Sequence, residues 1–138
     1  GFLDSDVNKA LFHGHTFTAN PTGCAAALAS LELLQTNTTQ ENLIRVNNRH
    51  LIFKKRIAQH PKVKATRVLG VIFALEIETE TKASYYGELR NKLYDFFIKN
   101  GVILRPVGNV VYILPPYIIT DEQLEKVYEV VEKALEIV

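Results

Sequence analysis

Hydrophobic and polar positions change period several times along the chain, and the first change comes near residue 20. Residues 1–19 hold Gly, Asp, Ser, Asn, His and Thr without a sustained period, which predicts a connecting loop. A helix is predicted from about Pro21 to Gln35, with Asn20 as its N-cap and proline at the first helical position. This segment is apolar or small nearly all round, so the helix is expected to need neighbours on several sides.

Two further segments show clear periods before residue 80. A second helix is predicted from the polar residues 38–41 to His60-Pro61, and its inward stripe is expected to hold Leu43, Val46, Leu51, Phe53 and Ile57. Residues 63–78 are rich in β-branched and apolar residues, which predicts two strands with Gly70 at the bend or bulge between them.

The last third of the chain repeats the change from helix to strand. After a polar linker over 79–84, residues 85–100 predict a helix that ends at Asn100-Gly101 and faces inward through Leu89, Leu93, Phe96 and Phe97. Short strands are predicted over 102–105 and 110–114, around a Pro-Val-Gly-Asn turn. A capping box at 120–123 then starts a final helix, with an apolar face of Leu124, Val127, Val130, Val131 and Leu135.

This order of elements predicts an α+β fold in which helices pack on a small, mostly antiparallel sheet. Many unrelated functions use such an architecture, so the fold alone does not decide what the protein does. A free-standing ligand-binding or dimerisation module is compatible with the same pattern.

Composition narrows the function classes. Sixteen Lys and Arg residues against fifteen Asp and Glu residues give a net charge of +1, so no electrostatic field favours nucleic acid or a membrane surface as partner. No apolar run approaches the roughly 20 residues that span a bilayer. Cys24 is the only cysteine, which excludes an internal disulfide and is typical of a reducing compartment, so a cytoplasmic location is expected.

Two motifs point to a chemistry. Residues 12–27 read FHGHTFTANPTGCAAA, and residues 104–120 read LRPVGNVVYILPPYIIT. The first resembles the segment that follows the cofactor lysine in fold-type I, class III aminotransferases. The second is similar to a C-terminal signature of the family branch that acts in biotin synthesis, and the Val68-Leu69-Gly70 stretch between them also fits. The resemblance covers essentially the whole chain.

The resemblance implies a division of the chain and a set of partners. Residues 1–20 would connect to a large domain, residues 21–36 would form an interdomain helix, and residues 37–138 would form the small C-terminal domain. The enzyme would be a homodimer that uses pyridoxal 5'-phosphate to transfer an amino group from S-adenosylmethionine to 8-amino-7-oxononanoate. The cofactor lysine and its acidic partner would precede His13. Residues 1–138 alone are therefore expected to be inactive. Ornithine, acetylornithine or an ω-amino acid are the alternative substrates in the same class.

The site residues that the resemblance implies also have plainer explanations. Thr16 and His15 would contact the cofactor phosphate, and Arg105, Gly14 and Tyr112 would contact substrate, with Arg105 holding its carboxylate. Alternatively, Thr16 is a simple turn residue, Arg105 pairs with an internal carboxylate, and Tyr112 packs in a strand.

No catalytic or metal-binding role is predicted for Tyr117, Cys24 and His13. Tyr117 is interpreted as a core aromatic, and Cys24 as a small packing residue at a helix start. His13 and His15 form a His-x-His pair, but the sequence offers no third ligand, so no metal site is predicted.

Overall fold

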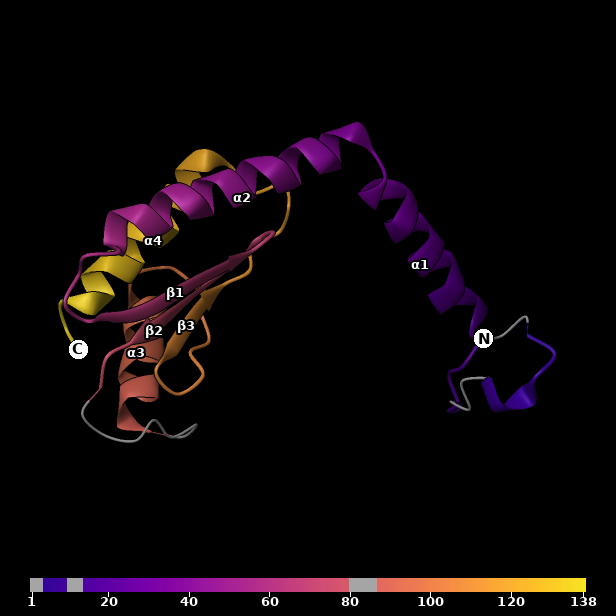
Figure 1. The fold of residues 1–138 in the computed structure, drawn as a ribbon, viewed down its shortest axis with the longest axis horizontal. Coiled ribbons are helices and arrows are strands. Elements are labelled where there is room, and N and C mark those ends of the chain that lie inside the picture. Colours follow the sequence, from indigo (N-terminus) through magenta and orange to yellow (C-terminus); the bar gives the residue numbers. More distant parts are fainter. Residues whose placement is uncertain (1–3, 10–13, 80–86) are drawn as a thin grey trace. The chain divides into compact units, whose positions relative to one another are not determined.

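The computed structural model describes residues 4–9, 14–79 and 87–138, and the chain divides into two compact units, residues 1–36 and 37–138. The first unit holds a short 3-10 turn, η1 (Val7–Lys9), and helix α1 (Pro21–Leu34). The second unit holds the elements α2 (Asn37–Ile57), β1 (Val63–Leu69), β2 (Ile72–Ile77), α3 (Glu88–Lys99), β3 (Val110–Ile113) and α4 (Asp121–Leu135) (Figure 1).

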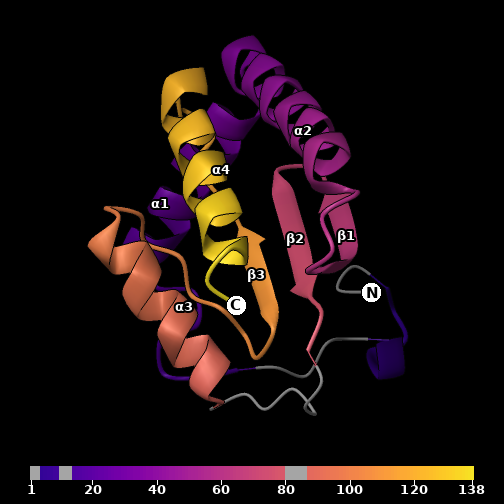
Figure 2. The ribbon, with the colours of Figure 1, turned by 90° about the vertical axis from the view of Figure 1, so that its left-hand side faces the viewer.

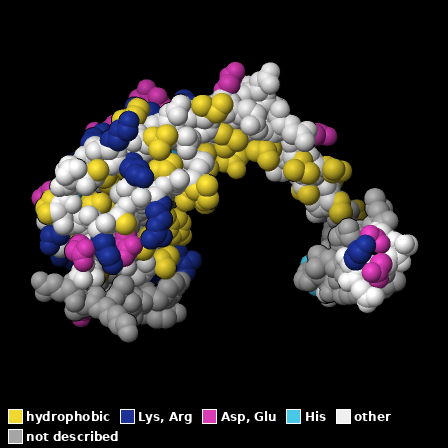
Figure 3. Space-filling view, in the orientation of Figure 1, with side chains coloured by type: hydrophobic (Ala, Val, Ile, Leu, Met, Phe, Trp, Pro, Cys, Tyr) yellow, Lys and Arg dark blue, Asp and Glu magenta, His cyan; other side chains and the backbone are white. Residues whose placement is uncertain are grey.

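Helix α1 starts as the sequence predicts. The Asn20 side chain accepts hydrogen bonds from the backbone N–H groups of Thr22 (3.0 Å) and Gly23 (3.3 Å), and Pro21 occupies the first turn. These bonds satisfy two of the N–H groups that a helix start leaves unpaired. No residue of α1 is buried, and Leu28 and Leu33 are 62% and 66% exposed. Figure 3 shows hydrophobic side chains on the surface of this helix.

The three strands of the second unit form an antiparallel sheet in the order β1-β2-β3. Leu69 pairs with Ile72, so Gly70 and Val71 form the tight turn of a hairpin. Gly70 has a φ of +55°, a conformation that residues with a Cβ rarely adopt, which explains why glycine stands between the two strands. The predicted bend at Gly70 is therefore confirmed.

Helices α2 and α4 lie side by side over one face of the sheet, and α3 packs against α4 (Figures 1 and 2). The core between these layers is apolar and nearly free of solvent. The sheet contributes Phe73, Leu75, Ile77, Val111 and Ile113, and the helices contribute Val46, Phe53, Ile57, Leu93, Phe97, Leu124, Tyr128 and Val131. This arrangement confirms the predicted α+β fold.

One polar pair crosses this core. His50 of α2 is fully buried; its Nε2 lies 3.0 Å from the carbonyl oxygen of Val71, and its Nδ1 lies 2.8 Å from the hydroxyl of Tyr128 in α4. The Val71 carbonyl can only accept, so Nε2 carries the proton and Nδ1 accepts from the Tyr128 hydroxyl. Burial lowers the pKa of His50 and raises the pKa of Tyr128. The pair therefore joins α2, α4 and the hairpin turn in its uncharged form.

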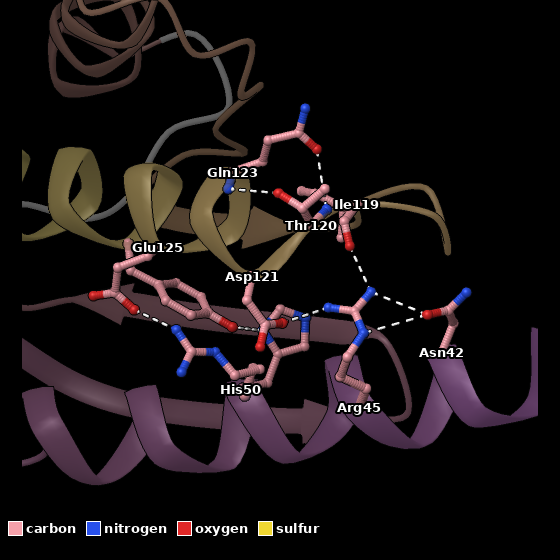
Figure 4. A network of polar contacts seen from close by, with 10 residues as sticks. Asn42, Arg45, His50, Ile119, Thr120, Asp121, Gln123 and Glu125 are labelled. Atoms are coloured by element: carbon pink, nitrogen blue, oxygen red, sulfur yellow. Dashed lines mark hydrogen bonds and ion pairs between the residues drawn. The ribbon is translucent and has the colours of Figure 1, made fainter.

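Charged contacts at the surface also join α2 to α4 (Figure 4). The Arg45 guanidinium donates to the carboxylate of Asp121 and to the backbone carbonyl of Ile119. Farther along both helices, Glu125 accepts from Arg49 (2.6 Å) and also pairs with Arg56. Arg45 thus holds the segment that leads into α4, where the predicted capping box of Thr120 is present.

Two details of the predicted helices and strands are wrong. Leu51 is 41% exposed and does not belong to the inward stripe of α2, whose buried residues are Val46, His50, Phe53 and Ile57. The segment 102–105 is extended, but it is not a strand, because its pairing with the β3 segment stops after the bridge between Val107 and Val110. Pro106, the next residue along, has no N–H with which to continue the ladder.

No described helix is long and apolar enough to cross a membrane.

Candidate cofactor and substrate site

Gly14, His15 and Thr16 lie together in a hydrogen-bonded turn before α1. The N–H of His15 donates to the Thr18 hydroxyl (2.8 Å), and the N–H of Thr18 donates to the carbonyl of His15 (2.9 Å). His15 Nδ1 also accepts from the N–H of Phe17 (3.1 Å). Short local hydrogen bonds therefore hold the turn.

Thr16 stands at the tip of this turn with its polar atoms available. Within the described residues, neither its hydroxyl nor its backbone N–H makes a hydrogen bond, and the residue is exposed. Gly14 is also exposed, and a Cβ at its position would meet no atom within 4 Å. This tip presents two donors that suit a phosphate oxygen.

The first motif contains two other residues that the sequence singled out, His13 and Cys24. His13 lies outside the described residues, so the structure leaves its position open. Cys24 is exposed on the first turns of α1. Residues 4–9, 14–79 and 87–138 contain no group of three or more His, Cys, Asp or Glu side chains arranged to hold a metal ion.

The second candidate group lies on the sheet face opposite the helices. Side chains alternate between faces along a strand, and Phe73, Leu75 and Ile77 point into the core, so Ile72, Ala74 and Glu76 point outward. Ala74 pairs with Arg67 of β1 on one side and with Tyr112 of β3 on the other. Tyr112 is therefore half-buried on the outer face of the sheet, two strands away from Arg67.

The burial pattern of residues 102–106, the segment before β3, indicates that Arg105 faces away from the core. Burial alternates along it: Val102, Leu104 and Pro106 are buried, whereas Ile103 and Arg105 are exposed. Among the described residues, this segment pairs with β3 only at the bridge between Val107 and Val110, and continuing that register by two residues would set Arg105 opposite Tyr112. We call Arg67, Ala74, Tyr112 and Arg105 the polar row.

Among the described residues, the charges of the polar row have few compensating partners. Arg105 makes no hydrogen bond or ion pair with any described residue. Arg67 reaches Glu76 only at 3.5 Å, whereas Lys64 reaches the same carboxylate at 2.9 Å, and its hydrogen bond lowers the pKa of Glu76. The alternative of an internal carboxylate partner for Arg105 is thus absent from the described part of the chain. An exposed guanidinium in this position can hold a carboxylate with two parallel bonds.

The sequence analysis missed Arg67, although its signal was present. Ala65, Arg67 and Leu69 occur at every second position of β1, which places all three on one face of the sheet. Tyr117, interpreted as a core aromatic, is instead 40% exposed in the loop that Arg45 holds. The two groups of candidate residues lie in different units of the chain.

Comparison with known proteins identifies the family. The family model described as "Aminotransferase class-III" matches residues 3–135. The chain belongs to the class-III aminotransferases. This result confirms the resemblance that the two sequence motifs carry.

Curated relatives agree on a more specific name. The adenosylmethionine-8-amino-7-oxononanoate aminotransferase of Synechococcus elongatus is 37% identical over 98% of this chain and 31% of its own length. The protein of the same name from Helicobacter pylori is 35% identical over 88% of this chain and 28% of its own length. The chain thus spans a little under one third of the curated relatives it matches.

Solved structures support the same fold. The adenosylmethionine-8-amino-7-oxononanoate aminotransferase of Methanocaldococcus jannaschii superposes with a TM-score of 0.78 at 26% identity, over 91% of this chain and 31% of that one. An omega-aminotransferase from Paracoccus denitrificans superposes with a TM-score of 0.80 at 30% identity. The match covers 95% of this chain and 30% of that one.

Proposed function

We propose that this chain forms the substrate-facing C-terminal part of a pyridoxal phosphate-dependent transaminase. The enzyme would transfer the amino group of S-adenosylmethionine to 8-amino-7-oxononanoate and give 7,8-diaminononanoate, a step of biotin synthesis. The proposal follows the names of the curated relatives, and the residues of the polar row supply its chemical basis.

The observation that carries the proposal is the position of Arg105. Arg105 is exposed, and it has no internal carboxylate partner among the described residues. The keto acid substrate ends in a carboxylate, which a planar guanidinium binds through two parallel hydrogen bonds. Tyr112, opposite Arg105 in register, would line the same pocket and offer a hydroxyl as donor or acceptor.

The turn before α1 fits the cofactor phosphate. Thr16 offers a free hydroxyl and a free N–H within the described residues, and a phosphate needs several such donors. His15 and Gly14 would shape the same turn, with Gly14 leaving room for substrate. In a homodimer, Thr16 would serve the cofactor of the neighbouring subunit. Bound pyridoxal phosphate supplies the aldehyde that takes up the amino group and the ring that withdraws electrons.

A second candidate function is transfer to an ω-amino acid or amine. Omega-aminotransferase structures superpose as well as the Methanocaldococcus structure does, at slightly higher identity. The Tyr112 and Pro-Pro-Tyr117 pattern favours the first reaction.

The experiment is a chimeric enzyme in which this chain replaces the matched region of the Synechococcus relative. We expect amino transfer from S-adenosylmethionine to 8-amino-7-oxononanoate, and no transfer by residues 1–138 alone. Arg105→Lys keeps the charge but loses the planar fork, so kcat/KM for the keto acid should fall by about tenfold or more, or at least about 1.4 kcal/mol. The half-reaction with S-adenosylmethionine should change little.

Arg90→Lys on α3 is the matched control, because Arg90 contacts Asn91 and the Tyr94 ring on the helical side of the unit. Because S-adenosylmethionine also carries a carboxylate, equal losses in both half-reactions contradict the carboxylate role of Arg105 only when Arg105→Lys also lowers the melting temperature of the chimera. Activity of the chimera with ω-amino acids but not with 8-amino-7-oxononanoate would establish the second candidate.

A further inference from the structure

A groove lies between helix α4 and two extended segments of the second unit. The segments are residues 101–104, which follow α3, and residues 113–116, which lead out of β3, and α4 forms the remaining side. The groove has a volume of about 620 Å³. Neither Arg105 nor Tyr112 lines it, so the groove is separate from the polar row.

Most side chains that line the groove are apolar. Ile103 and Leu114, one from each segment, are 86% and 57% exposed. Pro115 and Val127 add further apolar surface, and among the described residues the lining contains no carboxylate. An aliphatic chain that settles on such a surface is favoured, because apolar area of both partners leaves water. The groove therefore suits an aliphatic ligand, and its few polar groups decide which kind.

Lys126 places a positive charge in the groove, where segment 101–104 begins. A Cβ built on Gly101 would lie 3.5 Å from the Lys126 Nζ, so the ammonium stands over the backbone of Gly101. Among the residues that the structure describes, this ammonium makes no hydrogen bond or ion pair, although Glu122 and Glu129 stand one helical turn away on either side. The ammonium is therefore available to an anion from outside the chain.

The position of Lys126 also has a plainer explanation. Gly101 follows Asn100, the C-cap of α3, and the C-terminal end of a helix favours a nearby cation. Lys126 would then only stabilise the end of α3. The two explanations differ in one respect, because only a binding site responds to the charge and the chain length of a ligand.

We propose that this groove binds a small molecule in which an aliphatic chain carries a carboxylate. The chain lies along Ile103, Leu114 and Pro115, and the carboxylate accepts hydrogen bonds from the Lys126 ammonium and the Gln123 amide. Charge complementarity selects this ligand, because the groove offers a cation and an amide donor and, among the described residues, no anion. The proposal goes beyond the transaminase reaction and holds whichever amino acceptor the enzyme uses.

Chemical-shift titration of the 138-residue chain with octanoate tests the proposal. We expect saturable shifts at the backbone and methyl groups of Ile103, Leu114 and Val127. Hexanoate lacks two CH₂ groups and should bind at least about fourfold more weakly, the effect of one fully buried CH₂. Octylammonium, which has the same chain length and the opposite charge, should cause no saturable shifts at these residues.

Two substitutions on α4 separate the groove from the general charge of the chain. Lys126→Gln removes the ammonium and should weaken octanoate binding about three- to fivefold, the effect of one exposed ion pair. Lys133→Gln removes an exposed lysine of the same helix outside the groove, so it is the matched control and should leave binding unchanged. Arg105→Gln should also leave binding unchanged, because Arg105 does not line the groove.

Any of four results would overturn the proposal. Equal binding of octanoate and octylammonium, or unchanged octanoate binding in Lys126→Gln, would leave Lys126 with its role at the end of α3 alone. Shifts that disappear in Arg105→Gln would place the ligand in the polar row, and shifts confined to the exposed leucines of α1 would show adventitious binding. In methyl spectra of the Synechococcus chimera, unchanged Ile103 and Leu114 signals would show that the longer enzyme has no such site. If Lys126→Gln does not fold, the comparison of the three ligands on the unmodified chain decides the question.

Discussion

Removing one oxygen atom from the core should measure what the His50–Tyr128 pair contributes to stability. Tyr128→Phe deletes the hydroxyl that donates to His50 Nδ1 and leaves the ring, which stacks on Phe53 at 4.1 Å, in place. Both partners are at most 1% exposed, so water cannot replace the lost donor. A buried acceptor left unpaired costs about 1–3 kcal/mol.

Urea unfolding followed by circular dichroism at pH 7.5 gives the magnitude. A loss of about 2 kcal/mol, at a slope of roughly 1.5 kcal/mol per M, lowers the unfolding midpoint by about 1.3 M. Tyr94→Phe is the matched control, because the Tyr94 hydroxyl makes no hydrogen bond with any described residue. Its effect should stay within about 0.5 kcal/mol. Equal midpoints for the two variants would refute the role given to the pair.

The same pair predicts the effect of acid. Burial lowers the pKa of His50 in the folded chain, so the unfolded chain binds the proton first as the pH falls. The stability is then complete above the unfolded pKa of about 6.5 and falls below it, by at most about 1.4 kcal/mol per pH unit. His50→Gln should flatten this dependence between pH 6.5 and 5.5, and an unchanged slope in that variant would assign the effect to other groups.

Three further changes test separate parts of the fold. Arg45→Ala removes the contacts with Asp121 and the Ile119 carbonyl and should cost about 1 kcal/mol in urea unfolding, whereas Arg45→Lys should recover part of it. Gly70→Ala forces a Cβ into a φ of +55° and should cost about 1 kcal/mol, with Gly70→Asn less damaging. Thr120→Ala removes the N-cap of α4 and should lower the melting temperature by an amount equivalent to about 1 kcal/mol, and Thr120→Ser should restore it. In each case, equal effects of the two substitutions would contradict the stated cause.

The sequence predicted the elements whose causes are local. The Asn20 cap, the Gly70 turn and the Thr120 capping box depend on residues a few positions apart, and all three are present. Features that depend on residues far apart in the sequence were harder to predict. Leu51 fits an apolar helical period, but the inward face of α2 instead includes His50, whose partners are 21 and 78 positions away.

In the candidate site, too, local motifs were predictable and contacts between distant segments were not. Arg105 and Tyr112 were named from one motif, and continuing the register of the Val107–Val110 bridge would set them opposite each other. Arg67 joins their row only through two successive pairings, by way of Ala74. The functional roles of Gly14, His15, Thr16, Arg105 and Tyr112 stay predictions, and the chimera assay addresses those of Arg105 directly.

The interrupted pairing beside β3 has a consequence for how the chain behaves in concentrated solution. An edge strand with free N–H and C=O groups recruits strands from other molecules, which leads to aggregation. Here β3 has four residues, Pro106 stands in the segment beside it, and Pro115 and Pro116 follow closely after it, so this edge offers a foreign strand only a short ladder. At the opposite edge, β1 carries Lys64 and Arg67, whose charges repel an incoming copy of the same strand. The sheet is therefore protected against growth along its edges, and its one face without a helical cover is left for specific association.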